Sequence, residues 1–282
     1  MIETLKGDKL LSFALIFVIL QLALAVFAPV IAGDPFEQVI MARMQGPSFA
    51  HFLGTDQLGR DVFARILFGY RTSLITCGIA VLMALMIGGT LGMMAAYYRG
   101  WFDRIIMRVM DILFAFPIIL LAIGIIAVLG PNALSASIAI AVVYVPIFAR
   151  LLRGPSLVIC ESEYIRGAHA IGASDARIVF MHLLPNLASV ILVQTSLLLS
   201  AAILVEASLS FLGLGSQPPT PSLGLMLSEG RNFLLLNPWP AVFSGFAILF
   251  LSFGFNLLGD GLRDTLDPRL LKNTDRRNSA QA

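Results

Sequence analysis

Residues 72–98 read TSLITCGIAVLMALMIGGTLGMMAAYY, a run of 27 residues without a charged side chain between Arg71 and Arg99. A helix needs about 20 apolar residues to cross the hydrocarbon core of a bilayer, so this run predicts a transmembrane helix. The whole chain shares the bias, because 58% of its 282 residues are hydrophobic and only 13% are charged. Average soluble chains are about 45–50% apolar and about 25% charged. The net charge of +2 is too small to suggest a nucleic-acid partner.

Five further spans follow from the same reasoning. Residues 10–31 predict the first, since this run is longer than the roughly 7–15 apolar residues of a signal peptide. The 38 uncharged residues between Asp111 and Arg150 are too many for one crossing, and Gly-Pro-Asn at 130–132 favours a turn that divides them into spans at 105–129 and 134–152. Residues 187–211 and 239–260 predict the last two. The sequence therefore predicts an all-α, polytopic membrane protein with six transmembrane helices.

Basic residues are distributed unequally between the two sides of these spans. One side holds 14 of the 19 Lys and Arg residues, and the other holds Arg43, Arg60, Arg65, Arg71 and Arg231. Short cytoplasmic loops are enriched in Lys and Arg, so the first side is cytoplasmic and includes both termini. The predicted organisation is a cytoplasmic N-terminus (1–9), a first span (10–31), an external loop with a short interfacial helix (32–71), a transmembrane core (72–262) with a cytoplasmic loop at 153–186, and a cytoplasmic tail (263–282).

The cytoplasmic loop contains the polar stretch EYIRGAHAIGASDARIVFMHLLP at residues 163–185. Its pattern predicts two short helices, the first over 161–171 with Gly172 in the left-handed position that ends it. Ser174 is a suitable N-cap for the second, Asp175 favours its first turn, and Pro185 ends it. Connections in compact domains have a median of about 4–6 residues. A loop of this length with capped helices favours a docking element over an ordinary connection.

The spacing in this stretch resembles the EAA loop of bacterial ABC importer permeases. That pattern is Glu-Ala-Ala, three residues, Gly, nine residues, Ile, one residue and Leu-Pro. Here Arg166-Gly167-Ala168 is followed by Gly172 at the same spacing, and His182-Leu-Leu-Pro closes the motif. The chain departs from the pattern where Arg166 and Gly167 replace Glu-Ala and where His182 replaces Ile. Glycine inside a helix costs about 1 kcal/mol relative to alanine, so the first helix is expected to be weak or stabilised by a partner.

Three further segments are similar to permeases of the dipeptide, oligopeptide and nickel class, and specifically to the shorter, C-type subunit. They are FLGTDQLGRDVFARILFGYRTSL (52–74), EASLSFLGLGSQPPTPSLGLML (206–227) and FNLLGDGLRDTLDPRL (255–270). The resemblance implies a type I ABC importer permease fold in the bacterial inner membrane. It also implies a second homologous permease, two cytoplasmic ATPases that carry ATP and Mg, and a periplasmic or lipid-anchored binding protein. The chain itself would bind no cofactor and would be no enzyme.

The resemblance assigns ATPase docking to the cytoplasmic loop and leaves the cargo open. Peptides are the expected substrate, and nickel, glutathione or another small solute are the alternatives. The docking residues would be Glu163, Tyr164, Arg166, Gly167, Ala168, Ala170, Gly172, Ala173, Ser174, Leu184 and Pro185.

The external segment after the first span predicts a short interfacial helix. Thr55 would be its N-cap, and Asp61 and Arg65 would form an i,i+4 ion pair. The segment is either structural or a contact surface for the binding protein. The candidate contact residues are Gly54, Thr55, Asp56, Gly59, Arg60 and Asp61.

Glu206 is the acid within a predicted span, and intramembrane acids are functional candidates. The segment FLGLGSQPPTPS at 211–222 holds three prolines and cannot be regular helix, so it must be covered by protein or line water. We expect a gate near the external surface, with a structural or gating role for Glu206 favoured over substrate contact. The candidate gate or pathway residues are Glu206, Ser210, Phe211, Gly213 and Gly215.

Other functional classes fit the sequence less well. A gradient-driven secondary transporter would favour inverted repeats and several midplane ionisable residues, which the sequence does not show. An intramembrane protease would need a nucleophile pair, and no catalytic residue is indicated. The sequence predicts no metal site, since His51, His169 and His182 are dispersed, and no ATP hydrolysis, since it has no phosphate-binding glycine loop.

Overall fold

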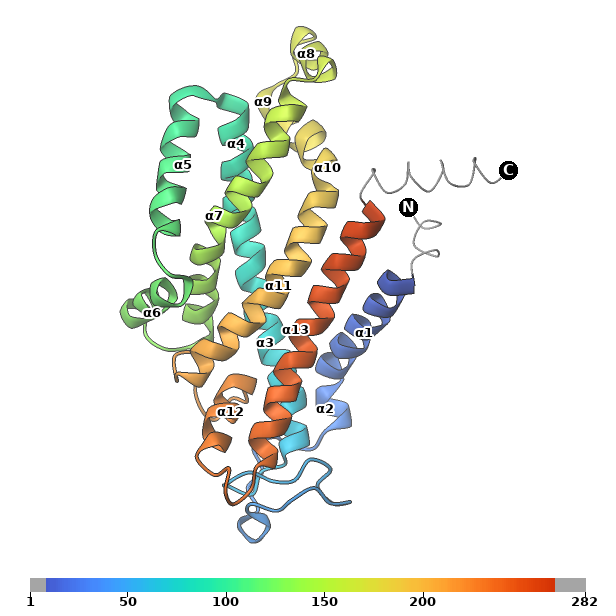
Figure 1. Ribbon diagram of the computed structural model, residues 1–282, viewed down its shortest axis with the longest axis vertical. Coiled ribbons are helices and arrows are strands. Elements are labelled where there is room, and N and C mark those ends of the chain that lie inside the picture. The colour runs from blue at the N-terminus through green and yellow to red at the C-terminus, as the bar shows by residue number, and fades with distance from the viewer. Residues whose placement is uncertain (1–8, 267–282) are drawn as a thin grey trace, which may run out of the picture.

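The computed structural model describes residues 9–266 and shows a bundle of helices (Figure 1). Within these residues there is no β-strand beyond an isolated bridge between Thr55 and Asp61. The helices are α1 (Lys9–Val26), α2 (Ala28–Ile31), α3 (Val62–Ala84), α4 (Thr90–Tyr98), α5 (Gly100–Phe114), α6 (Ile118–Leu129), α7 (Ala133–Cys160), α8 (Glu163–Ala170), α9 (Asp175–Arg177), α10 (Leu184–Asn186), α11 (Ala188–Phe211), α12 (Leu223–Arg231) and α13 (Trp239–Leu266), with a 3-10 turn at Ile40–Ala42 and π-helical segments at Leu85–Gly89 and Ile178–Leu183.

Five described helices are long and apolar enough to cross a membrane alone. The predicted number of six is reached if the bent pair α5–α6, whose axes differ by 92°, counts as one span. The predicted span over 105–129 is therefore not one continuous helix. Pro117 adopts an extended backbone with ψ of 133° at the bend. Proline cannot donate the hydrogen bond that a continuous helix would need there, which explains the break.

The second span begins earlier than predicted. The helix α3 starts at Val62 and continues through the π-helical segment into α4, so that residues 62–98 form one apolar helical span of 37 residues. No separate interfacial helix exists in the described loop after the first span, since its predicted residues are the first turns of α3. The charge of Arg65 does not interrupt the helix, because this side chain is buried beside the carboxylates of Asp56 and Glu229.

Close packing between helices relies on glycine. A Cβ atom on Gly88 or Gly92 would overlap the carbonyl oxygens of Val145 and Ala149, respectively, so the π-helical segment and α4 lie directly against the backbone of α7. Small residues four apart allow such close approach of membrane helices. On the other side of the bundle, Gln21 Nε2 of α1 donates to the carbonyl oxygen of Phe250 in α13 at 2.7 Å.

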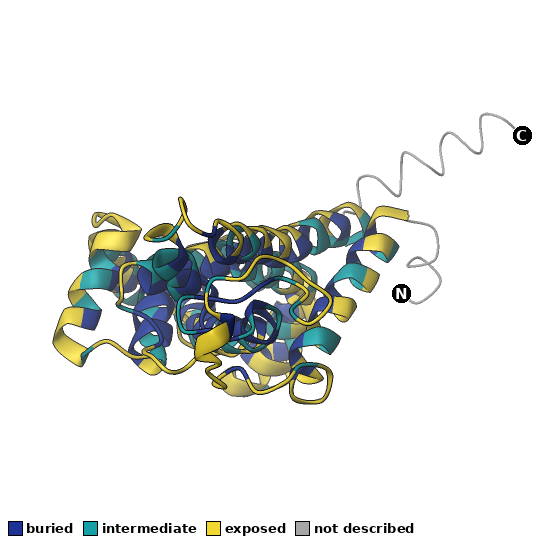
Figure 2. Ribbon diagram, turned by 90° about the horizontal axis from the view of Figure 1, so that it is seen from below, coloured by how far each residue is buried: buried dark blue, intermediate teal, exposed yellow. Residues whose placement is uncertain are grey.

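The helix ends are grouped as the predicted topology requires. The described ends of α1 and α13 lie toward the same end of the bundle as α8, and α12 lies near the opposite end (Figure 1). Most of the predicted N-terminal segment 1–9 and tail 263–282 lies outside the described residues. Seen from the end nearest α12, buried residues gather at the centre and exposed residues surround them (Figure 2). Exposed apolar side chains on outward helix faces, such as Ile16, Leu82 and Phe246, suit contact with lipid or with other subunits.

Candidate functional site

The cytoplasmic loop folds as two helices joined at a glycine hinge. Gly172 has a φ of +78°. The Gly172 amide donates to the carbonyl of His169 and the Ala173 amide donates to the carbonyl of Ala168, both at 3.0 Å. This pair of bonds is a Schellman motif, which satisfies carbonyls at the end of α8. The predicted left-handed position of Gly172 is confirmed.

The second helix of the loop also begins as predicted. The Ser174 hydroxyl accepts a hydrogen bond from the Arg177 amide and caps α9. The helix continues through the π-helical segment into α10 (Leu184–Asn186), so Pro185 lies within it and does not end it as predicted, because proline is tolerated in a first helical turn. The loop itself is shorter than the predicted range 153–186, because α7 extends to Cys160. Pro146 and Pro155 lie within α7 without ending it.

The loop presents an exposed surface away from the bundle and an apolar underside to it. Ile165, Ile178 and Leu183 are buried in a cluster with Met93 of α4 and Leu152 of α7. Of the predicted docking residues, Ala168 is buried, Ala173 and Leu184 are half-buried and the other eight are exposed. Large exposed side chains that the motif did not highlight lie beside them, namely Ile171, Phe180 and Met181.

Two tyrosines connect the loop to the cytoplasmic end of α4. The Tyr97 hydroxyl donates to Asp175 Oδ1 at 2.7 Å, and the Tyr98 hydroxyl donates to Asp175 Oδ2 at 3.2 Å. The His169 ring stacks on the Tyr97 ring with centroids 5.8 Å apart. We call Tyr97, Tyr98 and Asp175 the tyrosine clamp. The clamp was not predicted from the sequence. The signal that could have indicated it is the pair of adjacent tyrosines, both hydrogen-bond donors, at the end of the apolar run.

At the opposite end of the bundle, the predicted external contact residues are mostly buried. Gly54, Thr55, Asp56, Gly59 and Arg60 are buried, and Asp61 is half-buried. Thr55 is not an N-cap, since its hydroxyl donates to the carbonyl of Ala42. Asp61 is the N-cap of α3, where it accepts from the Ala64 amide at 2.9 Å. These residues therefore build the interior of this end of the bundle, and their side chains do not form an open contact surface.

The ion pairs of this region also differ from the prediction. Asp61 lies 2.8 Å from His51 and does not pair with Arg65. Arg60 Nε donates to Asp56 Oδ2 at 2.7 Å. Arg65 is only 1% exposed and lies 3.5 Å from Asp56 and 3.9 Å from Glu229. The predicted pair does not form because Asp61 is engaged by His51 and by the Ala64 amide, while Arg65 lies beside Asp56 and, less closely, Glu229 of α12.

Glu206 connects three elements near the external end of α11. It is 1% exposed and accepts hydrogen bonds from Ser73 of α3 at 2.9 Å and from Ser210 at 2.7 Å. Ser222, the residue before α12, donates to it at 3.5 Å. A carboxylate whose two oxygens both accept from hydroxyls of the protein suits a structural role, because little acceptor capacity is left for a ligand.

The other predicted gate residues surround this carboxylate. The segment after α11 is irregular, as its prolines predicted, and Gly213 has a φ of +78°. Gly215 packs directly against Ser210. Phe211 is the last residue of α11. The guanidinium carbon of Arg231 lies over the Phe211 ring, 5.1 Å from the ring centre. The predicted gate residues are therefore brought together, and α12 connects them to the ion pairs around Asp56.

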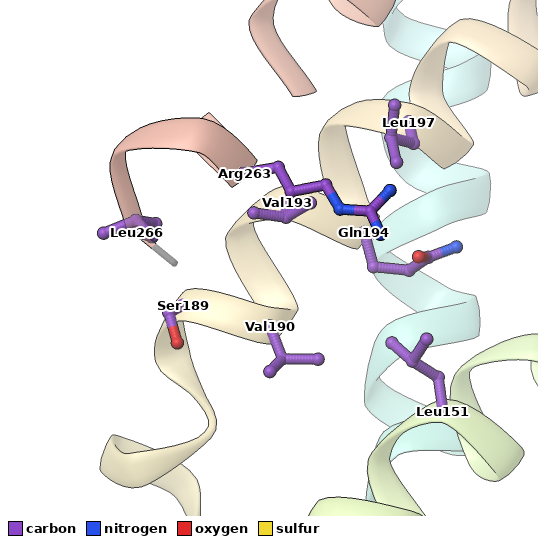
Figure 3. A pocket seen from close by; sticks show the side chains of 8 residues that line it. All are labelled: Leu151, Ser189, Val190, Val193, Gln194, Leu197, Arg263 and Leu266. Carbon is purple, nitrogen blue, oxygen red and sulfur yellow. The ribbon is translucent and has the colours of Figure 1, made fainter. Parts of the chain in front are cut away.

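A cavity of about 400 Å³ opens where α7, α11 and α13 approach one another near their cytoplasmic ends (Figure 3). Its walls are mostly apolar, and the Arg263 side chain reaches from α13 over Gln194 of α11. The combination of apolar walls, one guanidinium and one amide suits a small ligand with an anionic group. The sequence did not predict this site. Its lining residues are Leu151, Ser189, Val190, Val193, Gln194, Leu197, Arg263 and Leu266.

Comparisons with known proteins cover nearly the whole chain. Residues 88–272 match the family described as binding-protein-dependent transport system inner membrane components. The dipeptide transport system permease protein DppC of Alkalihalophilus pseudofirmus is 47% identical over 269 residues, which are 95% of this chain and 88% of the relative. The glutathione transport system permease protein GsiD of Pectobacterium atrosepticum is 48% identical over 259 residues, which are 90% of this chain and 85% of the relative.

A solved structure shares the fold. A chain from the inward-facing conformations of the MetNI methionine ABC transporter superposes with a TM-score of 0.59 and 18% sequence identity. The match covers 72% of this chain and 97% of that chain. At this identity the similarity concerns the fold alone.

Proposed function

Because the chain belongs to the family of binding-protein-dependent transport system inner membrane components, an ABC importer permease family, we propose that it is one of two permease subunits of a peptide importer. The family consists of transport permeases. In this proposal the chain lies in the bacterial inner membrane and forms half of the pathway together with a second, homologous permease. Two ATPases in the cytoplasm bind ATP and Mg, and an external binding protein delivers the cargo.

The cytoplasmic loop is the observation that carries this proposal. Its exposed surface combines Tyr164, Ile171, Phe180 and Met181 with the charged side chains of Glu163 and Arg166. Exposed apolar side chains accompanied by charged ones are typical of a surface that binds another protein. The buried side of the loop packs on α4 and α7, so an ATPase that moves the loop would also act on the spans.

The external gate would lie between α11 and α12. Glu206 accepts hydrogen bonds from Ser73, Ser210 and Ser222 and so connects α3, α11 and the start of α12 at this end of the bundle. ATP-driven movement needs two conformations of similar free energy, between which the ATPases and the cargo shift the population. The hydroxyl contacts of Glu206 are few enough to be broken in an outward-facing state. Glu206 is thus proposed to hold the gate and not to bind the cargo.

The contact with the binding protein needs different residues from those first predicted. The side chains around Asp56 are buried, whereas Met41, Phe49 and Phe52 in the same external loop are strongly exposed. Leu235 and Leu236, between α12 and α13, are exposed as well. We assign the binding-protein contact to these apolar side chains, with the ion pairs of Asp56 supporting the backbone beneath them.

Peptides are the proposed cargo because both relatives above carry peptide names. One is named for dipeptides and the other for glutathione, itself a modified tripeptide, and their identities to this chain are almost equal. Di- and oligopeptides are the first candidates, and glutathione is the second.

Competition in a reconstituted system tests this assignment. Proteoliposomes with both permeases, the ATPases and the binding protein would be given a labelled dipeptide, with unlabelled dipeptide, glutathione or nickel as competitor. A parallel assay would use labelled nickel in place of the dipeptide. The proposal predicts ATP-dependent dipeptide uptake that excess unlabelled peptide abolishes and nickel leaves unchanged. Uptake of labelled nickel but not of any peptide would contradict it, and competition by glutathione alone would favour the second candidate.

A further inference from the structure

The tyrosine clamp is the polar connection between the two helices of the cytoplasmic loop and α4. Asp175 lies in the first turn after the glycine hinge, and both of its carboxylate oxygens accept from tyrosines of α4. His169, from the last turn of α8, lies against Tyr97 and brings its Nε2 within 3.5 Å of the hydroxyl. One pair of adjacent residues on α4 thus contacts both helices of the loop.

Hydrogen bonds to a carboxylate are stronger and more directional than apolar contacts. The buried cluster around Ile165, Ile178 and Met93 holds the underside of the loop against α4 and α7 through close packing. The nearby ion pair between Arg99 and Glu161 joins the residues that follow α4 and α7, and so involves neither helix of the loop. The clamp therefore adds directional contacts between the loop and the end of α4.

The helix that carries the clamp also reaches the external end of the bundle. Residues 62–98 form one continuous helix, about 55 Å long at 1.5 Å per residue. Its far end holds Arg65 beside Asp56 and Glu229, and Ser73 donates to Glu206. A movement of the cytoplasmic end of this helix would therefore also move Arg65 and Ser73 at its other end. No second element is needed to transmit the movement to the external ion pairs and the gate.

We propose that Tyr97, Tyr98 and Asp175 form the joint through which movement of the cytoplasmic loop is transmitted to the spans. They are positioning residues, since they are proposed to act through their contacts with one another and with His169. The inference rests on the proposed function, because it requires an ATPase that moves the loop. It adds that docking and coupling are separable: the outer surface of the loop binds the ATPase, and the clamp transmits its motion.

The test uses the whole complex in proteoliposomes and removes only hydroxyl groups. The double variant Tyr97→Phe, Tyr98→Phe keeps both rings and the stacking on His169. Co-purification of the ATPases is expected to stay unchanged. ATP hydrolysis is expected to stay within about twofold, while the number of ATP molecules used per transported peptide rises roughly 5- to 20-fold, within the usual range of coupling between distant sites.

A matched control and a second variant keep the test decisive. Tyr70→Phe makes the same chemical change at a buried position of the same long helix, outside the clamp, and is expected to leave the ratio unchanged. Asp175→Asn is expected to raise the ratio as well. Combined with the double tyrosine variant it should add little, because the residues act through shared hydrogen bonds.

Two results would overturn the proposal. An unchanged ratio of ATP to peptide in the double tyrosine variant would show that the joint lies elsewhere. Loss of the ATPases from the purified variant would show that the clamp only shapes the docking surface. Failure of the unmodified chain to co-purify with ATPases would instead contradict the proposed function, so the two failures are distinguishable.

Discussion

Gly172 is the residue at which the cytoplasmic loop reverses direction. Its φ of +78° is favourable for glycine and costs other residues about 1–2 kcal/mol, with β-branched residues the most strained. A Cβ added to Gly172 would meet no atom beyond its chain neighbours within 4 Å, so backbone strain and not steric overlap would decide the effect. Gly172→Val is therefore expected to lose ATPase association or coupling, measured by co-purification and uptake, while membrane insertion persists.

A graded series sharpens this prediction. Gly172→Asn should be mild and Gly172→Ala intermediate, because asparagine tolerates the left-handed region better than alanine. Gly130→Val introduces strain between α6 and α7, far from the loop, at a φ of +85° and a ψ of 149° that only glycine adopts readily, and it should keep the ATPases bound. Normal coupling in Gly172→Val would contradict the docking role of this hinge.

Glu206 offers a second test at the scale of one side chain. Glu206→Ala removes the acceptor of three serine hydroxyls and is expected to cost about 1–2 kcal/mol, given the modest strength of such bonds in membranes. The melting temperature of the purified complex should fall by roughly 2–8 °C. Glu206→Gln keeps an acceptor and should lose less. A raised KM for uptake with an unchanged melting temperature would indicate substrate contact instead.

Local signals predicted the cytoplasmic loop better than the external segment. The cap at Ser174 and the hinge at Gly172 depend on neighbours within four residues, and both are present in the structure. The carboxylates beside Arg65 are those of Asp56, nine residues before it, and of Glu229, which folding brings from the far side of α11. Sequence separation gave no sign of the contact with Glu229, and the i,i+4 spacing pointed to Asp61 instead.

The π-helical segment and α4 pack against α7 so closely that side-chain size decides the interface. At Gly92 a Cβ atom would meet the backbone of Ala149, which has no flexible end that could move aside. Gly92→Ala should therefore cost about 1–3 kcal/mol, as overpacking usually does. Thermal unfolding of the purified complex measures this loss.

Gly78 provides the matched control within the same long helix. No atom lies within 4 Å of a Cβ at this position, so Gly78→Ala should be neutral or stabilising. Equal melting temperatures for the two variants would contradict the packing described here.

The helical elements themselves were largely predictable because their apolar runs are long. The first and last residues of these helices were less predictable. The predicted start of the second span at residue 72 rested on the charge of Arg71, whereas the helix begins at Val62 with Asp61 as its cap. The bend at Pro117 was also missed, since proline alone does not distinguish a kink from a break with a 92° turn.

At the scale of the molecule, the orientation of the chain makes a testable prediction. Phe49 is fully exposed in the external loop and Ile171 is 87% exposed in the cytoplasmic loop. In a background without Cys160, the variant Phe49→Cys should react with a membrane-impermeant maleimide in intact cells. Ile171→Cys should react only after the cells are opened, and the reverse pattern would contradict the orientation.

Energy coupling tests the central claim most directly. The measurement is uptake of a labelled peptide by proteoliposomes that contain this chain, the second permease, the ATPases and the binding protein, without any ion gradient. The account predicts uptake that requires hydrolysable ATP and stops with a non-hydrolysable analogue. Uptake driven by an ion gradient in the absence of ATP would contradict it.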